Sequence, residues 1–324
     1  MVITDFFKKN ITIILSLMLV TISIFFLVQN LSIAEILKNN NSIDLKIFED
    51  LRLPRLFACI LIGSALSMSG AILQVILSNP LAEPGIMGIS GGASVGVALV
   101  YCFLSIEPSI LNIMCFAMVG SLIFTVILVV LSVKFYFSAT KLLLAGLSLG
   151  LFSSVIVTWS YYFSTALNMK LLMYWLMGSL SGISWIHVYV LILMLPIMIW
   201  LYLKSNVLDL IMLGDLHAKQ LGINIERFRI ILIVVLSIVI GLCVSCSGVI
   251  SFLGLIIPHC MRLLLGSSNK PILLNSAITG AILLLISDIL SRSLISYTEI
   301  PVGIVITTLS VPIFIYLLIR FNHE

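Results

Sequence analysis

The chain has 324 residues, of which 61% are apolar and 9% charged, and its mean hydropathy is +1.27. A water-soluble domain usually has a charged fraction of about 25%, so this composition excludes a soluble protein and predicts a membrane protein with many spans. At roughly 20 residues per span, the apolar runs leave room for about nine to eleven helices and none for a soluble catalytic domain. The net charge of +4 is informative through its distribution across the membrane, and we do not expect a nucleic-acid partner.

Ten apolar segments are predicted to cross the membrane. They lie at about 11–31, 53–77, 85–105, 110–133, 142–163, 186–203, two within 230–265, 272–290 and 302–319. The first follows Lys8 and Lys9, is too long for a signal-peptide core and lacks a small-residue cleavage site, so we interpret it as a retained span. The pair within 230–265 requires a tight turn near 245–248 or near Pro258. The predicted fold is an all-α polytopic membrane protein with about ten spans, forming one domain over 1–324.

Two segments between the spans have a different composition. Residues 32–52 carry charges of both signs and are interpreted as a polar loop. Residues 164–185 are amphipathic, and the aromatic side chains of Tyr174, Trp175 and Trp185 favour a helix lying at the membrane interface.

A polar, basic stretch over 203–229 separates two long apolar runs and reads LKSNVLDLIMLGDLHAKQLGINIERFR. Its pattern predicts two short helices, 204–213 and 215–221, with Gly214 between them. Asp215 is the expected N-cap of the second helix and Gly222 its C-terminal stop. Neither helix is long enough to span a bilayer.

The distribution of basic residues predicts the orientation. With ten spans and a cytoplasmic N-terminus, eleven of the 17 Lys and Arg residues fall on the cytoplasmic side and six outside. This excess favours a topology in which both termini and the stretch 203–229 are cytoplasmic.

A short internal repeat divides the chain around that stretch. Six residues recur at a constant offset of 178: Gly63, Ser67, Ser69, Gly70, Ile72 and Pro80 match Gly241, Ser245, Ser247, Gly248, Ile250 and Pro258. The first set lies in a span entering from outside and the second in a span entering from inside. The repeat therefore predicts inverted topology, which is common in transporters.

Small residues and helix breaks mark where helices pack closely. Glycines at four-residue spacing, as in Gly88-x3-Gly92-x3-Gly96 and Gly146-x3-Gly150, let helix backbones approach each other in lipid. The break at 79–84 frees carbonyl groups that lipid cannot satisfy, so we expect it to border protein or a water-filled path.

Three groups of residues could carry chemistry: a serine in a glycine-rich segment, an acidic residue within a span, and the cysteines and histidines. The segment Gly88-Ile-Ser90-Gly-Gly92 matches a nucleophile pattern, with His259 on another span, but it opens an apolar helix rather than a strand-to-helix turn, which disfavours an intramembrane serine hydrolase. Asp288 has Arg292 one helical turn later, which favours an i,i+4 ion pair over a proton or sodium relay. The six cysteines lie in apolar sequence and the histidines are dispersed, so we predict no disulfide framework, metal site or cofactor.

No phosphate-binding loop of the form G-x4-G-K-[ST] occurs in the chain. Any dependence on ATP would therefore come from a partner, and the chain itself is not expected to be an enzyme.

Several longer motifs carry a family resemblance. They are Arg52-Leu-Pro-Arg55, Ser69-Gly70, Asn79-Pro-Leu-Ala-Glu-Pro84, Gly214-Asp215 with Ala218 and Leu221-Gly222, Gly254-Leu-Ile-Ile-Pro-His259 with Arg262, Asp288 with Arg292, and Glu299-Ile-Pro-Val-Gly303. With these motifs the chain resembles, over nearly its whole length after the first span, the permease subunits of ABC importers for iron-siderophores, haem and vitamin B12.

The resemblance implies a subunit of the bacterial cell membrane that pairs with a second copy or a paralogue and encloses a translocation path. It also implies two cytoplasmic ATP-binding ATPase subunits and an extracytoplasmic substrate-binding protein. The ATPase-coupling loop lies within 204–229, and its matching positions are Leu208, Leu213, Gly214, Asp215, Ala218, Leu221 and Gly222. Arg52, Arg55 and Arg292 match positions that dock the binding protein, and we expect the first two on the outer surface. Asn79, Pro80 and Leu81 would lie near the cytoplasmic gate.

The expected function is therefore the permease of an ATP-driven importer for a ferric siderophore, with haem or cobalamin as alternatives. An ion-coupled secondary transporter that uses Asp288 is a more remote alternative.

Overall fold

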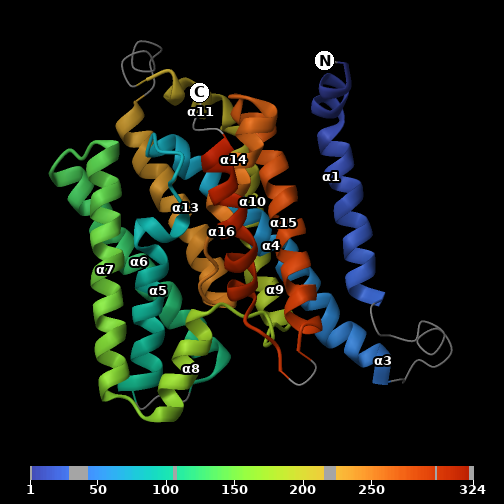
Figure 1. Cartoon of the computed structure of the whole chain (residues 1–324). Helices are drawn as coiled ribbons and strands as arrows, with labels where there is room; N and C mark the ends of the chain where they lie inside the picture. The colour runs from blue at the N-terminus through green and yellow to red at the C-terminus, as the bar shows by residue number, and fades with distance from the viewer. Residues whose placement is uncertain (1, 29–42, 105–107, 215–223, 296–297, 321–324) are drawn as a thin grey trace.

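The computed structural model describes residues 2–28, 43–104, 108–214, 224–295 and 298–320. Regular structure in these ranges is entirely helical, and the helices form a bundle (Figure 1). The elements are α1 (Val2–Val28), α3 (Ile43–Lys46), η1 (Ile47–Arg52), α4 (Leu53–Ile76), η2 (Pro84–Met87), α5 (Ile89–Ala98), η3 (Leu99–Phe103), α6 (Ile110–Lys134), α7 (Ala139–Phe163), α8 (Ala166–Leu176), α9 (Trp185–Ile192), α10 (Leu195–Leu203), α11 (Ser205–Met212), α13 (Ile225–Ser247), α14 (Leu253–Leu265), α15 (Asn269–Ser293) and α16 (Val302–Arg320).

The described helices occupy the places of the ten predicted spans. Seven are long and apolar enough to cross a membrane, and three shorter apolar helices cover Ile89–Phe103, Leu253–Leu265 and Val302–Leu317. The prediction of an all-helical protein with many spans is confirmed. The turn between α13 and α14 follows Ser247, close to the first of the two predicted positions, and Pro258 lies inside α14.

Helix α14 reaches only part of the way across the bundle. Its 13 residues span about 20 Å at 1.5 Å per residue, against a bilayer core of about 30 Å. The break before it, and the break between α4 and η2, place irregular backbone next to apolar helices. Both must be satisfied within the protein.

The segment 43–52 was expected to be loop, and this expectation is wrong. Residues 43–52 form α3 and η1, which continue into α4 as one helical stretch over Ile43–Ile76. The only proline in this stretch, Pro54, lies where the wider π-helical turns of η1 pass into α4, so the helix continues past its missing N–H. The charged residues of 43–52 therefore lengthen the helix beyond the apolar span.

The helix predicted for 204–213 forms as α11, whereas the region 164–185, predicted to be an interfacial helix, is helical only in α8 and is irregular over 177–184. Helix α8 begins at Thr165, whose side chain accepts a hydrogen bond from the Asn168 N–H. Helix α11 ends at Met212, and Gly214 follows with a φ of 104°, which favours glycine. The second predicted helix, 215–221, lies outside the described residues.

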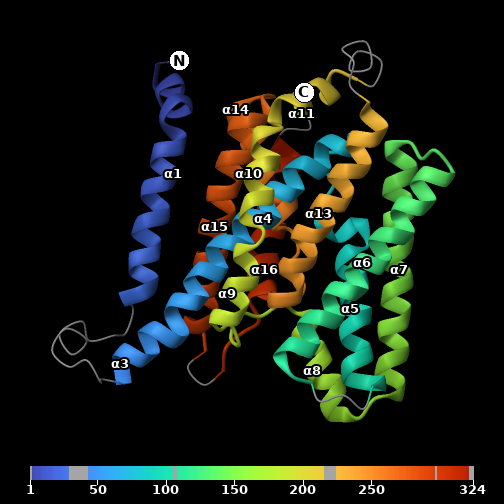
Figure 2. The same ribbon diagram turned by 180° about the vertical axis from the view of Figure 1, so that it is seen from behind.

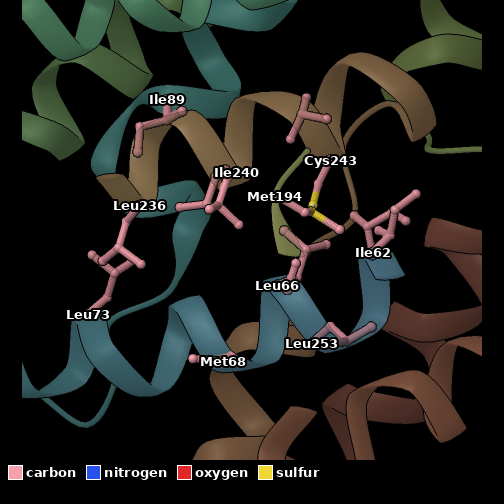
Figure 3. Packing of buried hydrophobic residues seen from close by; sticks show 14 of the residues in the cluster. Ile62, Leu66, Met68, Leu73, Ile89, Met194, Leu236, Ile240, Cys243 and Leu253 are labelled. Atoms are coloured by element: carbon pink, nitrogen blue, oxygen red, sulfur yellow. The ribbon is translucent and has the colours of Figure 1, made fainter. Parts of the chain in front are cut away.

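Helix α4 lies at the centre of the bundle. In the most apolar part of the stretch Ile43–Ile76, 78% of the residues are buried inside the protein. The corresponding share is 22% for α7 and 6% for α1. Figure 3 shows how its side chains meet those of α13 and of the residue before α10: Ile62, Leu66 and Leu73 from α4, Leu236, Ile240 and Cys243 from α13, and Met194. The peripheral position of α1 and α7 leaves their outer faces for lipid or another subunit.

The two halves of the sequence repeat run in opposite directions. In Figures 1 and 2, α4 runs from the end of the bundle near α3 towards the end near α11, whereas α13 runs the opposite way. Inverted topology requires this arrangement. The beginning of α1 and the end of α16 lie at the α11 end (Figure 1).

Glycines allow the central helices to touch through their backbones. A Cβ atom on Gly63 would lie 2.5 Å from the Gly280 carbonyl oxygen of α15, and one on Gly70 would collide with Gly254 of α14. The predicted packing role also holds for Gly92, which meets Gly120 of α6. Gly150 differs, because nothing in the described residues lies within 4 Å of a Cβ placed there.

We predict that Gly70→Ala lowers the stability of the purified protein, whereas Gly150→Ala leaves it unchanged. The added methyl group at position 70 meets the backbone of α14, which has no rotamer with which to avoid it, and overpacking of a core costs about 1 to 3 kcal/mol. The melting temperature in detergent measures the difference. Equal melting temperatures for the two variants would contradict the assigned helix contact.

Candidate functional site

Four charged side chains meet at the α3 end of the bundle, and we call them the Arg55 cluster. Arg55 of α4 donates to both carboxylate oxygens of Asp288 on α15, at 2.7 to 3.0 Å. It also donates to Glu299 through Nη1 at 3.1 Å and Nη2 at 2.9 Å. Arg292 approaches Asp288 with its Nε at 3.3 Å. The cluster therefore joins α4, α15 and the segment before α16.

The cluster is largely removed from water. The Asp288 side chain is fully buried and that of Arg55 is 10% exposed, while Glu299 is 38% exposed. A buried carboxylate is tolerable only when it is paired and hydrogen-bonded; here Arg55 donates the hydrogen bonds and Arg292 adds a second positive charge. The guanidinium of Arg292 also lies 4.4 Å from the ring centre of Phe26, so the cluster holds the end of α1.

The structure agrees with one expectation about these residues and corrects another. The i,i+4 pair of Asp288 with Arg292 is confirmed. The expectation that Arg55 lies on the outer surface is wrong, because its guanidinium is engaged by two carboxylates. The sequence offered no sign of this pairing, since Arg55 and Asp288 are 233 positions apart.

Arg52 lies one helical turn before Arg55 and is partly exposed. Its Nη1 donates to the Leu27 carbonyl at 2.9 Å, which links α1 to η1. Of the three predicted docking arginines, Arg52 and Arg292 thus keep some accessible surface and Arg55 keeps little.

The predicted gate residues follow the other end of α4. Ser78 has a φ of 47°, and the Leu81 N–H then donates to the Asn79 side-chain oxygen at 2.9 Å, which closes a tight turn. Pro80 and Leu81 are exposed. The structure thus brings Asn79, Pro80 and Leu81 together in one turn at the α11 end of the bundle.

Glu83 connects this break to the one that precedes α14. Its Oε2 accepts a hydrogen bond from the Phe252 N–H at 3.0 Å. Phe252 has a φ of 68°, a conformation uncommon for a residue with a side chain. The carboxylate thus satisfies a backbone donor of an irregular segment that lipid could not satisfy.

A hollow lined by hydroxyl groups opens beside these breaks. It consists of two neighbouring cavities of about 410 and 290 Å³ that share Leu176, Val249 and Ser251. Its polar lining comes from α5, α7, α16 and the segments before η2 and α14: Ser90, Ser94, Ser153, Thr307, Thr308, Glu83 and Ser251. We call it the hydroxyl-lined hollow.

The hydroxyl groups of this hollow bind mostly to their own helices. Ser94 donates to the Ser90 carbonyl, Ser153 to the Gly150 carbonyl and Thr308 to the Ile304 carbonyl, at 2.7 to 2.9 Å. The oxygen atoms remain as weak acceptors. Such a surface is polar enough to be wetted and offers few directional contacts, which suits passage better than tight binding.

The structure describes three of the predicted coupling residues. Leu208 of α11 is buried against the bundle, whereas Leu213 is 63% exposed and Gly214 is exposed. Asp215, Ala218, Leu221 and Gly222 lie outside the described residues. The described end of this stretch therefore presents an exposed apolar side chain and an exposed glycine at the end of the bundle.

The sequence matches the FecCD transport family over residues 13–320. The chain belongs to this family. It is 46% identical over 284 residues to the vitamin B12 import system permease protein BtuC of Vibrio vulnificus, which covers 88% of this chain and 86% of the relative. It is 41% identical over 272 residues to the protein of the same name from Photorhabdus laumondii, covering 83% and 81%.

A solved structure has the same fold. It is described as an inward-facing conformation of a metal-chelate type ABC transporter, and it superposes with a TM-score of 0.88 at 27% identity. The match covers 97% of this chain and all of that chain. The resemblance to the importer permeases is thereby confirmed.

As a FecCD permease, the chain is the membrane component of an ABC importer and has no catalytic activity of its own. The geometry agrees with this for both rival sites. Among the described residues no hydrogen bond joins Ser90 to His259, whose ring instead lies 6.4 Å from that of Phe314. Both oxygens of Asp288 are occupied by arginines, which argues against an ion relay at that position.

We predict that Asp288→Ala destabilises this FecCD permease strongly, whereas Glu299→Gln has a smaller effect. Removing the buried partner leaves Arg55 without its main counter-charge, which typically costs about 3 to 5 kcal/mol. The Glu299 pair is partly exposed and is screened by water, so its contribution is at most about 1 kcal/mol. Chemical denaturation of the two purified variants measures the loss in free energy of unfolding for each. Similar losses would show that burial of Asp288 is not the controlling factor.

Proposed function

We propose that this chain is the permease of an ATP-driven importer for vitamin B12 or a closely related corrinoid. The observation that carries the proposal is the 46% identity, over 88% of the chain, to permeases named for vitamin B12 import. Cobalamin thus replaces the ferric siderophore as the first choice of cargo. A metal chelate such as a ferric siderophore or haem is the second candidate, favoured by the structural match to a metal-chelate type transporter.

The proposed path runs along the hydroxyl-lined hollow. On one chain the two parts of the hollow measure about 410 and 290 Å³, within the range for ligand pockets, and the hollow is open on one side. The helices at its edge, α7 and α16, carry exposed side chains along much of their length. We infer that a second copy, or a paralogue, covers this face and supplies the opposite wall.

The other proposed partners are the subunits that bind at the two ends of the helix bundle. The sequence has no phosphate-binding loop, so two separate ATPase subunits would supply the energy. They would bind at the α11 end, which the excess of basic residues assigns to the cytoplasm together with both termini. The coupling residues Leu213 and Gly214 lie at that end, as does the gate turn that begins at Asn79.

The α3 end would then face outwards and receive the substrate-binding protein. Arg52 and Arg292 keep partial exposure there, which suits electrostatic steering of acidic groups. Arg55 would contribute to docking only if Glu299 were displaced, because this glutamate occupies its outer side.

The cargo is tested by deleting the gene and restoring it while two uptake rates are measured in parallel. We expect the deletion to abolish high-affinity uptake of labelled cyanocobalamin and the restored gene to recover it, while uptake of a ferric siderophore stays unchanged. The opposite pattern would assign the chain to iron import and would contradict the proposal.

We also predict that Thr308→Trp reduces transport without preventing assembly. Thr308 lines the hollow and is exposed on the isolated chain, so an indole there would narrow the proposed path without entering the core. Val126→Trp on α6 is the matched control, because Val126 is 60% exposed and does not line the hollow. Uptake is measured in proteoliposomes containing the whole complex. Equal uptake by both variants would exclude this path.

A further inference from the structure

Helix α11 is attached to the bundle by a polar contact as well as by its apolar face. Oδ1 of Asp209 accepts hydrogen bonds from both the backbone N–H and the side-chain amide of Asn269, each at 2.7 Å. Asn269 is the first residue of α15 and is fully buried. A carboxylate is stabilised at this position, because the first N–H groups of a helix lack partners within it and carry partial positive charge.

The contact continues from Asn269 into α14. The Asn269 side-chain oxygen accepts a hydrogen bond from Nη2 of Arg262 at 3.2 Å. The same nitrogen donates to the Ala71 carbonyl at 3.0 Å, and Nε of Arg262 lies 3.4 Å from the side-chain oxygen of Gln74. One guanidinium thus joins the beginning of α15 to the last turns of α4.

These contacts end at the break that contains the gate turn. Gln74 is buried, and its amide nitrogen donates to the Leu255 carbonyl of α14 at 3.2 Å. Two residues later α4 ends at Ile76, and the turn over 79–81 follows. Asn269 and Gln74 are buried, so water cannot easily replace their hydrogen bonds when α11 shifts.

We propose that Asp209, Asn269 and Arg262 form a relay of positioning residues that transmits displacement of α11 to the end of α4 and the adjoining gate turn. The inference rests on the proposed function, in which α11 belongs to the loop that the ATPase subunits move. The apolar contacts of Leu208 and Ile211 hold α11 against the bundle, but an apolar face can slide. The directional hydrogen bonds of the relay fix its position along α15 and α4.

The test compares transport with ATP hydrolysis in the same proteoliposomes, using the complete complex with its ATPase and binding protein and cyanocobalamin as cargo. We expect Asp209→Ala and Asn269→Ala to lower the cargo moved per ATP hydrolysed by about tenfold, as the loss of a hydrogen bond to a charged group allows. Asp209→Asn keeps an acceptor oxygen towards Asn269 and should retain most of the coupling. A residue that only stabilised the fold would lower uptake and hydrolysis together.

Asn275→Ala is the matched control. Asn275 lies on the same helix and is buried, and within the part of the chain that the structure describes its side chain donates to the Pro271 carbonyl of that helix. We expect its ratio of uptake to hydrolysis to equal that of the unaltered complex. If Asn269→Ala does not fold, the contrast between Asp209→Ala and Asp209→Asn decides the question, because Asp209 is only partly buried.

Two outcomes would contradict the relay, and both can be distinguished from a failure of the proposed function. Unchanged coupling in Asp209→Ala, or an equal loss in Asn275→Ala, would contradict the relay while the unaltered complex still imports cobalamin. An unaltered complex that neither binds an ATPase nor moves cargo would contradict the proposed function, and the relay would fall with it.

Discussion

The direct backbone contact of α4 with α15 and α14 is the constraint on which the structure depends. Gly63 meets Gly280, and Gly70 meets Gly254, so no side chain separates these helices at their crossing points. In lipid, where apolar side chains gain little by leaving the solvent, such close packing is a main source of helix association. The three helices form a core around which the longer and more exposed helices are arranged.

Polar groups hold both ends of the same helix pair. At the α3 end, Arg55 of α4 binds Asp288 of α15, and at the α11 end Arg262 joins Ala71 of α4 to Asn269 of α15. With glycine contacts between, α4 and α15 are fixed in register over nearly their full length. A force applied at one end would therefore move the pair as a unit rather than bend it.

The sequence predicted those features that depend on local pattern. Apolar runs located the spans, and the spacing of Asp288 and Arg292 predicted their ion pair because it needs only one helical turn. Contacts between distant segments had no such signal, which is why the partnership of Arg55 with Asp288 and Glu299 was missed. The helix over 43–52 was missed for a different reason. Its charged residues resemble those of a loop, and no cap or helix-breaking residue marks where a helix would begin. The short length of α14 was hidden because a continuous apolar run does not show where the chain turns.

The hydrogen bond from Phe252 to Glu83 has a consequence for how a path could open. It ties the break in the first half of the repeat to the break in the second half, at the point where both backbones are irregular. In carriers made of one chain, inverted halves rock against each other around a central site. Here this bond joins the two halves, so alternating access within one chain would separate the Glu83 carboxylate from the Phe252 N–H, and water in the hydroxyl-lined hollow would have to replace the lost contact. Opening between this chain and a second subunit, as the proposed function has it, would leave the bond intact, so the two breaks would stay joined while parts such as α11 shift.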